Sequence, residues 1–130
     1  MFLVRDIMFC KPGQARPMVQ RFLALDKLGR QMGFGPMRVM TDVSAERYWT
    51  VVSEMEVESL EKYAEMSKRS MEMKEFQEAM KGYHDLVVEG RREILLLKKN
   101  FNVFTNPNTD QLLDALDPDE IVVFGVATDV

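Results

Sequence analysis

The chain has 130 residues, of which 46% are hydrophobic and 29% charged. This composition suits one globular domain of ordinary size and excludes a wholly disordered chain. The net charge of −4 argues against a nucleic-acid partner. No apolar run approaches the roughly 18 residues of a membrane span, so no membrane partner is expected either. Arg5 and Asp6 interrupt the first apolar stretch, which argues against a signal peptide, and the single cysteine, Cys10, favours a reduced, cytoplasmic setting.

The charge is unevenly distributed along the chain. Residues 1–99 hold all 17 lysines and arginines and 15 of the 21 acidic residues, a balance of +2. Residues 100–130 hold the other six acidic residues and no basic one, a balance of −6. Every methionine lies at or before Met80, and every asparagine lies after Lys99. Together these shifts indicate a break in composition near residue 98.

The first half of the chain predicts three strands and a helix. Residues 1–9 alternate in hydrophobicity, with Leu3, Ile7 and Phe9 on one face, and therefore predict a strand. Residues 14–32 change to a helical period. The sequence predicts two further strands, over residues 37–43 and 48–57, joined by a polar turn over 44–47 as an antiparallel pair.

The second half completes a common fold. Ser59 is a plausible N-cap for a helix over residues 60–88, with a break near Ser67–Ser70 and a stop at Gly90. Residues 91–97 predict a fourth strand. Residues 1–97 therefore follow the β-α-β-β-α-β order of an α+β, ferredoxin-like fold. Residues 98–130 predict a C-terminal loop-helix-strand extension, which gives a division into 1–97 and 98–130.

Both faces of the predicted sheet carry large apolar side chains, although two helices can cover only one face. The strand Tyr48–Met55, and the segment from Phe76–Met80 through Gly82-Tyr83 to Gly90–Ile94, resemble the dimeric α/β-barrel families, including the antibiotic biosynthesis monooxygenase-like proteins. The resemblance implies that two four-stranded sheets pair into one barrel. We therefore expect a homodimer.

The same resemblance implies enzymes that oxidise aromatic polyketides or degrade haem, in some cases without a cofactor. The haem-degrading branch uses an Asn, Trp and His set, and residues 1–99 contain no asparagine, so that chemistry is not carried over. We predict a protein that binds an apolar or aromatic small molecule, with cofactor-independent monooxygenase-like activity as its enzymatic form. The alternative is a non-catalytic dimeric binding or interaction module. No cofactor and no metal are expected.

The expected ligand pocket lies between the sheet and the helices. Its candidate lining residues are Arg38, Asp42, Trp49, Tyr83 and His84. Two of them have a structural alternative, a core or interface anchor for Trp49 and a position near a helix C-terminus for His84. The methionine series predicts core packing or, alternatively, a methionine-lined cavity for a flat apolar ligand. A pocket with converging polar groups would favour ligand binding, whereas a filled interior would favour the non-catalytic module.

The tail carries a second resemblance. The segment Lys98–Asn108, Leu112-Leu113 and the ending Ile121–Val130 are similar to the isochorismatase-like cysteine hydrolases. In that family a lysine at the position of Lys98 belongs to an Asp–Lys–Cys triad, and the peptide corresponding to Val126–Ala127, after Gly125, shapes the oxyanion site. The nucleophilic cysteine would follow Val130, and the aspartate has no counterpart in residues 1–97. A lysine without these two groups cannot run the covalent reaction, so we expect a fragment without hydrolase activity, joined by a gene fusion, a frameshift or an artificial chimera.

Overall fold

The computed structural model describes residues 1–98. These residues form four strands and three helices. They are β1 (Phe2–Cys10), α1 (Ala15–Gln31), β2 (Met37–Thr41), β3 (Thr50–Val57), α2 (Leu60–Glu72), α3 (Lys74–Ala79), the 3-10 turn η1 (Tyr83–Asp85) and β4 (Val87–Leu96). The strands form one antiparallel sheet in the order β2-β3-β1-β4. The predicted α+β, ferredoxin-like fold is confirmed.

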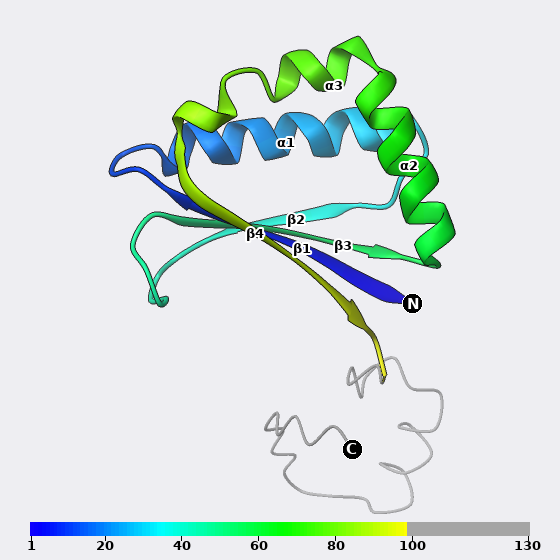
Figure 1. The fold of residues 1–130 in the computed structure, drawn as a ribbon, viewed down its shortest axis with the longest axis horizontal. Helices are drawn as coiled ribbons and strands as arrows, with labels where there is room; N and C mark the ends of the chain where they lie inside the picture. The colour runs from blue at the N-terminus through cyan, green and yellow to red at the C-terminus, as the bar shows by residue number, and fades with distance from the viewer. Residues whose placement is uncertain (99–130) are drawn as a thin grey trace, which may run out of the picture. The chain divides into compact units, whose positions relative to one another are not determined.

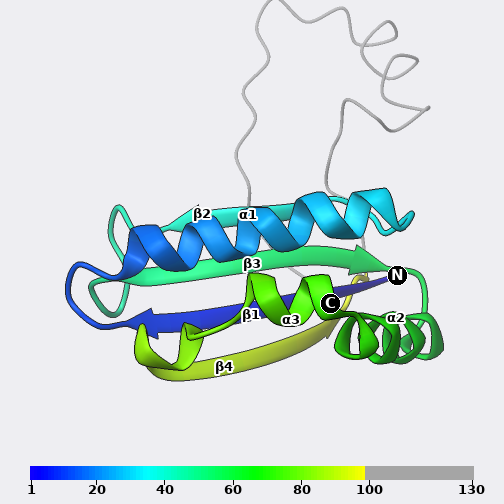
Figure 2. The same ribbon diagram turned by 90° about the horizontal axis from the view of Figure 1, so that it is seen from above.

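The three helices cover one face of the sheet (Figure 1). Helix α1 packs against β2 and β3, α3 lies beside α1, and α2 lies at the end of the sheet next to α3 (Figure 2). We call this side of the sheet the helix face. The other side carries no helix of the described residues, and we call it the open face.

The core forms where α1 meets the centre of the sheet. Met18 and Phe22, one helical turn apart on α1, are buried against Val51 of β3 and Cys10 at the end of β1. Met18 and Val51 have no exposed surface. The sequence predicts this stripe because residues four apart share one face of a helix.

Alternation along β1 assigns its residues to the two faces as predicted. Val4, Asp6 and Met8 point to the helix face, while Ile7 and Phe9 lie with the side chains of the open face. Because β1 is central, its register also assigns faces on both of its neighbours.

The helix predicted over residues 60–88 breaks later than the predicted Ser67–Ser70 and does not continue to residue 88. Helix α2 ends at Glu72 because Met73 is extended, with φ −89° and ψ 128°. The Gln77 side chain donates a hydrogen bond to the Met71 carbonyl (2.8 Å), which satisfies an end group of α2. Gly82, at φ 77°, then turns the chain out of the helical conformation altogether.

The predicted helix stop at Gly90 is also wrong, because this glycine lies inside β4 opposite Met8. A Cβ atom at position 90 would lie 3.1 Å from the Met8 sulfur, so a larger residue would displace that methionine. Strand β4 consequently begins earlier than predicted, at Val87.

The β2–β3 connection is longer than the predicted turn. β2 ends at Thr41 and β3 begins at Thr50, so Asp42 and Trp49 belong to the loop. The Asp42 carboxylate accepts a hydrogen bond from the Thr50 amide (3.0 Å), and Trp49 adopts a left-handed φ of 63°. A bulky residue at such an angle carries backbone strain, which ends the regular pairing here.

The predicted extension over residues 98–130 lies outside the described residues except for Lys98, which is exposed. Residues 1–96 form one compact unit. Within residues 1–98, no helix is long and apolar enough to cross a membrane.

Candidate functional site

A cavity of about 600 Å³ lies between the helix face of the sheet and the helices. We call it the helix–sheet cavity. Its lining is dominated by sulfur and aromatic side chains: Met8, Met37, Met55, Met66, Met71, Met80, Phe22, Phe34, Tyr63, Phe76 and Tyr83. Methionine is flexible and polarisable, so such a lining adapts to irregular or flat apolar shapes.

The space exists because α2 and α3 present small or partly exposed side chains to the sheet. Tyr63, Met66, Ser67 and Ser70 recur at helical spacing on α2 and all line the cavity. Neither α2 nor α3 contributes a fully buried residue. Large aliphatic side chains at the two serine positions would fill the gap, and the serines leave it open.

One ion pair lies on the floor of the cavity. Arg92 of β4 donates from Nε to Asp6 Oδ1 (2.6 Å) and from Nη2 to Oδ2 (3.3 Å), which is a two-point contact. The Arg92 guanidinium also lies 5.9 Å from the centre of the Tyr63 ring. The hydrogen bonds to Asp6 are the main reason that the pKa of Arg92 is raised above its ordinary value. This pair is the polar part of an otherwise apolar floor.

Asp26 of α1 forms a second polar feature of the wall. Its Oδ1 accepts a hydrogen bond from the Met37 amide (2.8 Å), and Arg30 donates to it from one turn further along the helix (3.0 Å to Oδ2). Burial acts to raise the pKa of Asp26, but these hydrogen bonds together outweigh burial and lower the pKa below its ordinary value. The carboxylate thereby ties α1 to the start of β2.

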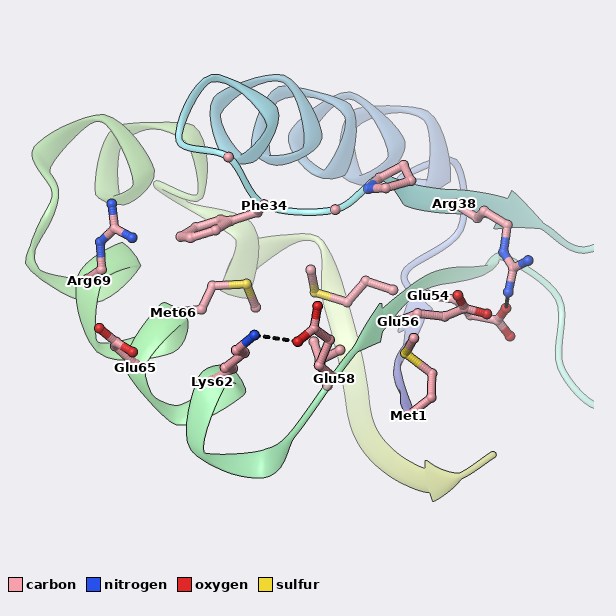
Figure 3. Close-up of a pocket in the computed structure, with 15 residues that line it drawn as sticks. Met1, Phe34, Arg38, Glu54, Glu56, Glu58, Lys62, Glu65, Met66 and Arg69 are labelled. Atoms are coloured by element: carbon pink, nitrogen blue, oxygen red, sulfur yellow. Dashed lines mark hydrogen bonds and ion pairs between the residues drawn. The ribbon is translucent and has the colours of Figure 1, made fainter. Parts of the chain in front are cut away.

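A second hollow, of about 580 Å³, adjoins the cavity at the start of α2 (Figure 3). We call it the α2 groove. Phe34, Gly35, Met55 and Met66 line both hollows, so the groove leads toward the cavity.

Charged side chains surround the α2 groove. Arg38 pairs with Glu54 (2.8 Å), Lys62 pairs with Glu58, and the Arg69 guanidinium lies 5.4 Å from the centre of the Phe34 ring. The groove therefore combines a polar rim with an apolar end at Phe34.

The structure does not bring the five predicted pocket residues together. Tyr83 lines the helix–sheet cavity, and Arg38 lies in the α2 groove. Asp42 and Trp49 line a separate hollow beside the β2–β3 loop. His84 stacks against Tyr83, with ring centres 3.9 Å apart, and lines a hollow next to β4.

Of the predicted hydrolase-like residues, only Lys98 lies within the described part of the chain. Lys98 is exposed at the end of the described residues, and Gly125, Val126 and Ala127 lie outside them. Cys10 is a buried free thiol, and burial raises its pKa. It therefore resembles a core residue rather than an activated nucleophile.

Sequence reasoning missed most of the polar lining, namely Asp6, Asp26, Ser53, Tyr63, Ser67, Ser70, Gln77 and Arg92. One signal was present: alternation places the charge of Asp6 on the same strand face as Val4 and Met8. A charged side chain on an apolar face needs an oppositely charged or hydrogen-bonding partner, because burying an unpaired charge is costly. The sequence alone does not identify that partner, since it depends on strand register. Within residues 1–98, no group of three or more His, Cys, Asp or Glu side chains is placed to hold a metal ion.

The fold and the site define a ferredoxin-like α+β protein with an apolar cavity between sheet and helices. No protein-family model and no curated protein matches the chain. Among solved structures, an uncharacterized NIPSNAP-like domain protein from Burkholderia xenovorans is similar with a TM-score of 0.65 and 23% identity, over 78% of this chain and 87% of that one.

Two further structures share the arrangement. A NIPSNAP family protein from Agrobacterium tumefaciens aligns with a TM-score of 0.63 and 16% identity, over 77% of this chain and 94% of its own. An antibiotic biosynthesis monooxygenase aligns with a TM-score of 0.58 and 13% identity, over 76% of this chain and 100% of its own. At these identities the likeness establishes the fold.

The hydrogen bonds to Asp26 predict a pH-dependent contribution to stability. Because its pKa is lower in the folded than in the unfolded chain, the contribution is present above the unfolded value of about 4 and is lost as the pH falls through the folded value. Asp26→Asn should lower the free energy of unfolding by about 1–2 kcal/mol at pH 7. The difference from the unmodified protein should shrink toward pH 3 in urea unfolding series.

The matched control is Glu78→Gln, which removes an exposed carboxylate on α3. It should change the free energy of unfolding little at either pH. A loss for Asp26→Asn that stays constant from pH 7 to pH 3 would contradict the role assigned to the ionised carboxylate.

Proposed function

We propose that this protein binds an apolar or aromatic small molecule in the helix–sheet cavity. The observation that carries the proposal is the cavity itself: about 600 Å³ lined by six methionines, five aromatic rings and a few converging polar groups. Small-molecule sites are mostly apolar hollows of this size with a few polar groups that fix orientation. An interior filled by its own side chains would instead have supported a non-catalytic interaction module.

The proposal concerns binding and commits to no reaction. Monooxygenase-like activity rests on the sequence resemblance alone, and binding without catalysis is its alternative. Both require that the cavity takes up a ligand, so ligand uptake is the property to test first.

We further propose that two copies of the chain pair through the open face of the sheet, as a dimeric α/β barrel would. Apolar side chains of this face lie on all four strands: Leu3, Ile7, Phe9, Met40, Val52 and Leu95. Met40 and Leu95 are 39% and 44% exposed. A second copy would cover this face with an identical surface, as two-fold dimers do.

The charges of the open face support the same proposal. Arg5 pairs with Glu54 (2.7 Å) and Glu93 (3.3 Å), and Arg38 also pairs with Glu54 (2.8 Å). Arg91, Glu56 and Glu89 also lie on this face, so three arginines and four glutamates nearly balance one another within one copy. A face with so small an excess of charge can meet its own copy with little repulsion.

A cytoplasmic, reduced setting is also proposed, with neither nucleic acid nor a membrane as partner. The buried free thiol of Cys10 supports the reduced setting.

Filling the cavity should abolish ligand binding. Nile red, a neutral and planar dye, is the probe, and its fluorescence rises in apolar surroundings. Ser67→Phe directs a ring from α2 into the cavity, so we expect dye affinity to fall roughly tenfold or more. Lys68→Phe, the adjacent and exposed position, is the matched control and should leave affinity unchanged. Equal dye binding by both variants would contradict the proposed site.

Charging the open face should separate the two copies. By light scattering after size-exclusion chromatography, the unmodified protein should show twice the chain mass of 15.1 kDa. Val52→Glu places a charge between the apolar Ile7 and Met40 on the open face and should yield the single-chain mass. Leu23→Glu, on α1 where Leu23 is 52% exposed, should stay at twice the mass. A monomeric unmodified protein would refute the dimer.

For residues 98–130 we propose a fused hydrolase-like fragment that performs no hydrolysis. The support is the sequence motif around Lys98 and Gly125–Ala127, together with the lack of a counterpart to the catalytic aspartate in residues 1–97. Purified protein should not hydrolyse nicotinamide or isochorismate above the rate of a Lys98→Ala variant. Turnover that depends on Lys98 would overturn this assignment.

A further inference from the structure

Three polar side chains lie in one row across the floor of the helix–sheet cavity. Asp6 on β1 is paired in register with Ser53 on β3 and with Arg92 on β4. All three line the cavity. We call them the polar row.

The rows on either side of the polar row are apolar. They consist of Met55, Val4 and Ile94 on one side and of Val51, Met8 and Gly90 on the other. Polar character on this face of the three strands is thus confined to a single line, about one residue wide.

Fold stability gives little reason for the polar row. The Arg92 side chain is 56% exposed and the Asp6 side chain 21%, and ion pairs that are this open to water contribute only about 0–1 kcal/mol. Apolar side chains of similar size commonly stabilise such a position as well as an ion pair does. A polar row in an apolar cavity is instead the expected form of a group that orients a ligand.

Ser53 supplies an independent observation. The residue is 3% exposed, and none of the hydrogen bonds found among residues 1–98 uses its hydroxyl. The hydroxyl lies at the cavity wall, where it can both donate and accept. Among the described residues no buried side-chain oxygen or nitrogen lacks a partner, so this hydroxyl is open to the cavity, where a molecule can hydrogen-bond to it.

The remaining hydrogen-bonding capacity of the row defines the chemistry of that partner. Each Asp6 oxygen accepts one hydrogen bond from Arg92 and keeps lone pairs for another donor. The Nη1 group of Arg92 takes no part in the contact with Asp6. The row therefore offers acceptors at its centre and donors at both ends.

The charges of the cavity disfavour an anionic ligand. Asp6, Asp26 and Arg92 are the charged groups of the described lining, and Arg92 is already neutralised by Asp6. Asp26 is occupied by Met37 and Arg30. A carboxylate on the ligand would meet Asp6 without a free cation to balance it, whereas a hydroxyl would donate to Asp6 and accept from Ser53 or Arg92.

We propose that the polar row recognises a neutral hydroxyl group on an apolar or aromatic ligand. This inference rests on the proposed function and adds the chemical class of the ligand. The hydroxyl hydrogen is donated to Asp6, and its oxygen accepts from Ser53 or Arg92.

Three naphthalenes that differ in one substituent test the proposal: 2-naphthol, 2-methoxynaphthalene and 2-naphthoate. Dissociation constants are measured by calorimetry at pH 7. We expect 2-naphthol to bind about tenfold or more tightly than either of the others, because the ether cannot donate and the carboxylate is repelled.

Substitutions in the polar row test whether the preference for 2-naphthol arises there. Ser53→Ala should weaken 2-naphthol about fivefold and leave naphthalene, which has no oxygen to accept from Ser53, unchanged. Ser44→Ala removes an exposed hydroxyl of the β2–β3 loop, outside the cavity, and should change neither. Asp6→Asn frees Arg92, so 2-naphthoate should bind more tightly than to the unmodified protein. A misfolded variant could not produce such a gain.

Two outcomes separate this inference from the proposed function. If Nile red binds and is lost in Ser67→Phe, but the unmodified protein binds 2-naphthol no more tightly than 2-methoxynaphthalene, the hydroxyl inference is wrong and the binding site stands. If neither Nile red nor any naphthalene binds, the proposed function fails and the inference fails with it.

Discussion

The antiparallel pairing of β1 with both β3 and β4 is the constraint on which the rest of this structure depends. Side chains alternate between the two sides of a strand, so the register of one central strand decides which residues of its neighbours face the helices. A shift of one residue would move Asp6 to the open face and Arg5 into the cavity. The cavity floor and the proposed dimer surface are therefore two consequences of a single register.

The two faces use charge in different ways. On the helix face, one carboxylate and one guanidinium stand within an apolar floor, and their pairing keeps the cavity close to neutral. On the open face, Glu54 lies between Arg5 and Arg38 with a side chain only 11% exposed. Exposed ion pairs contribute about 0–1 kcal/mol each. Covered by a second copy, the same pairs would be desolvated and would favour the one alignment that keeps them satisfied.

Local patterns predicted the order of the elements and the faces of β1 and β3, because alternation and helical spacing are properties of adjacent residues. They did not predict the end of α2, since nothing in the apolar stripe marks Met73 as extended. The pairing of Asp6 with Arg92 joins residues 86 positions apart and requires the register. Candidate residues chosen by type alone, such as Asp42 and Trp49, consequently lie at the β2–β3 loop instead of in the cavity.

The helix side of the cavity is flexible, whereas the sheet side is held in place by backbone pairing. Met66 and Met71 lie on α2, a helix without a buried residue, so their flexible side chains can adjust to ligands of different outline. Ser53 and Asp6 lie on the two central strands of the sheet, where backbone pairing on both sides holds them in place. In the proposed binding site, the helices would therefore adapt to the shape of the ligand, while the sheet would fix the positions of its hydrogen bonds. Such a site would accept several carbon skeletons that carry the same polar group, because only the strands impose a fixed geometry.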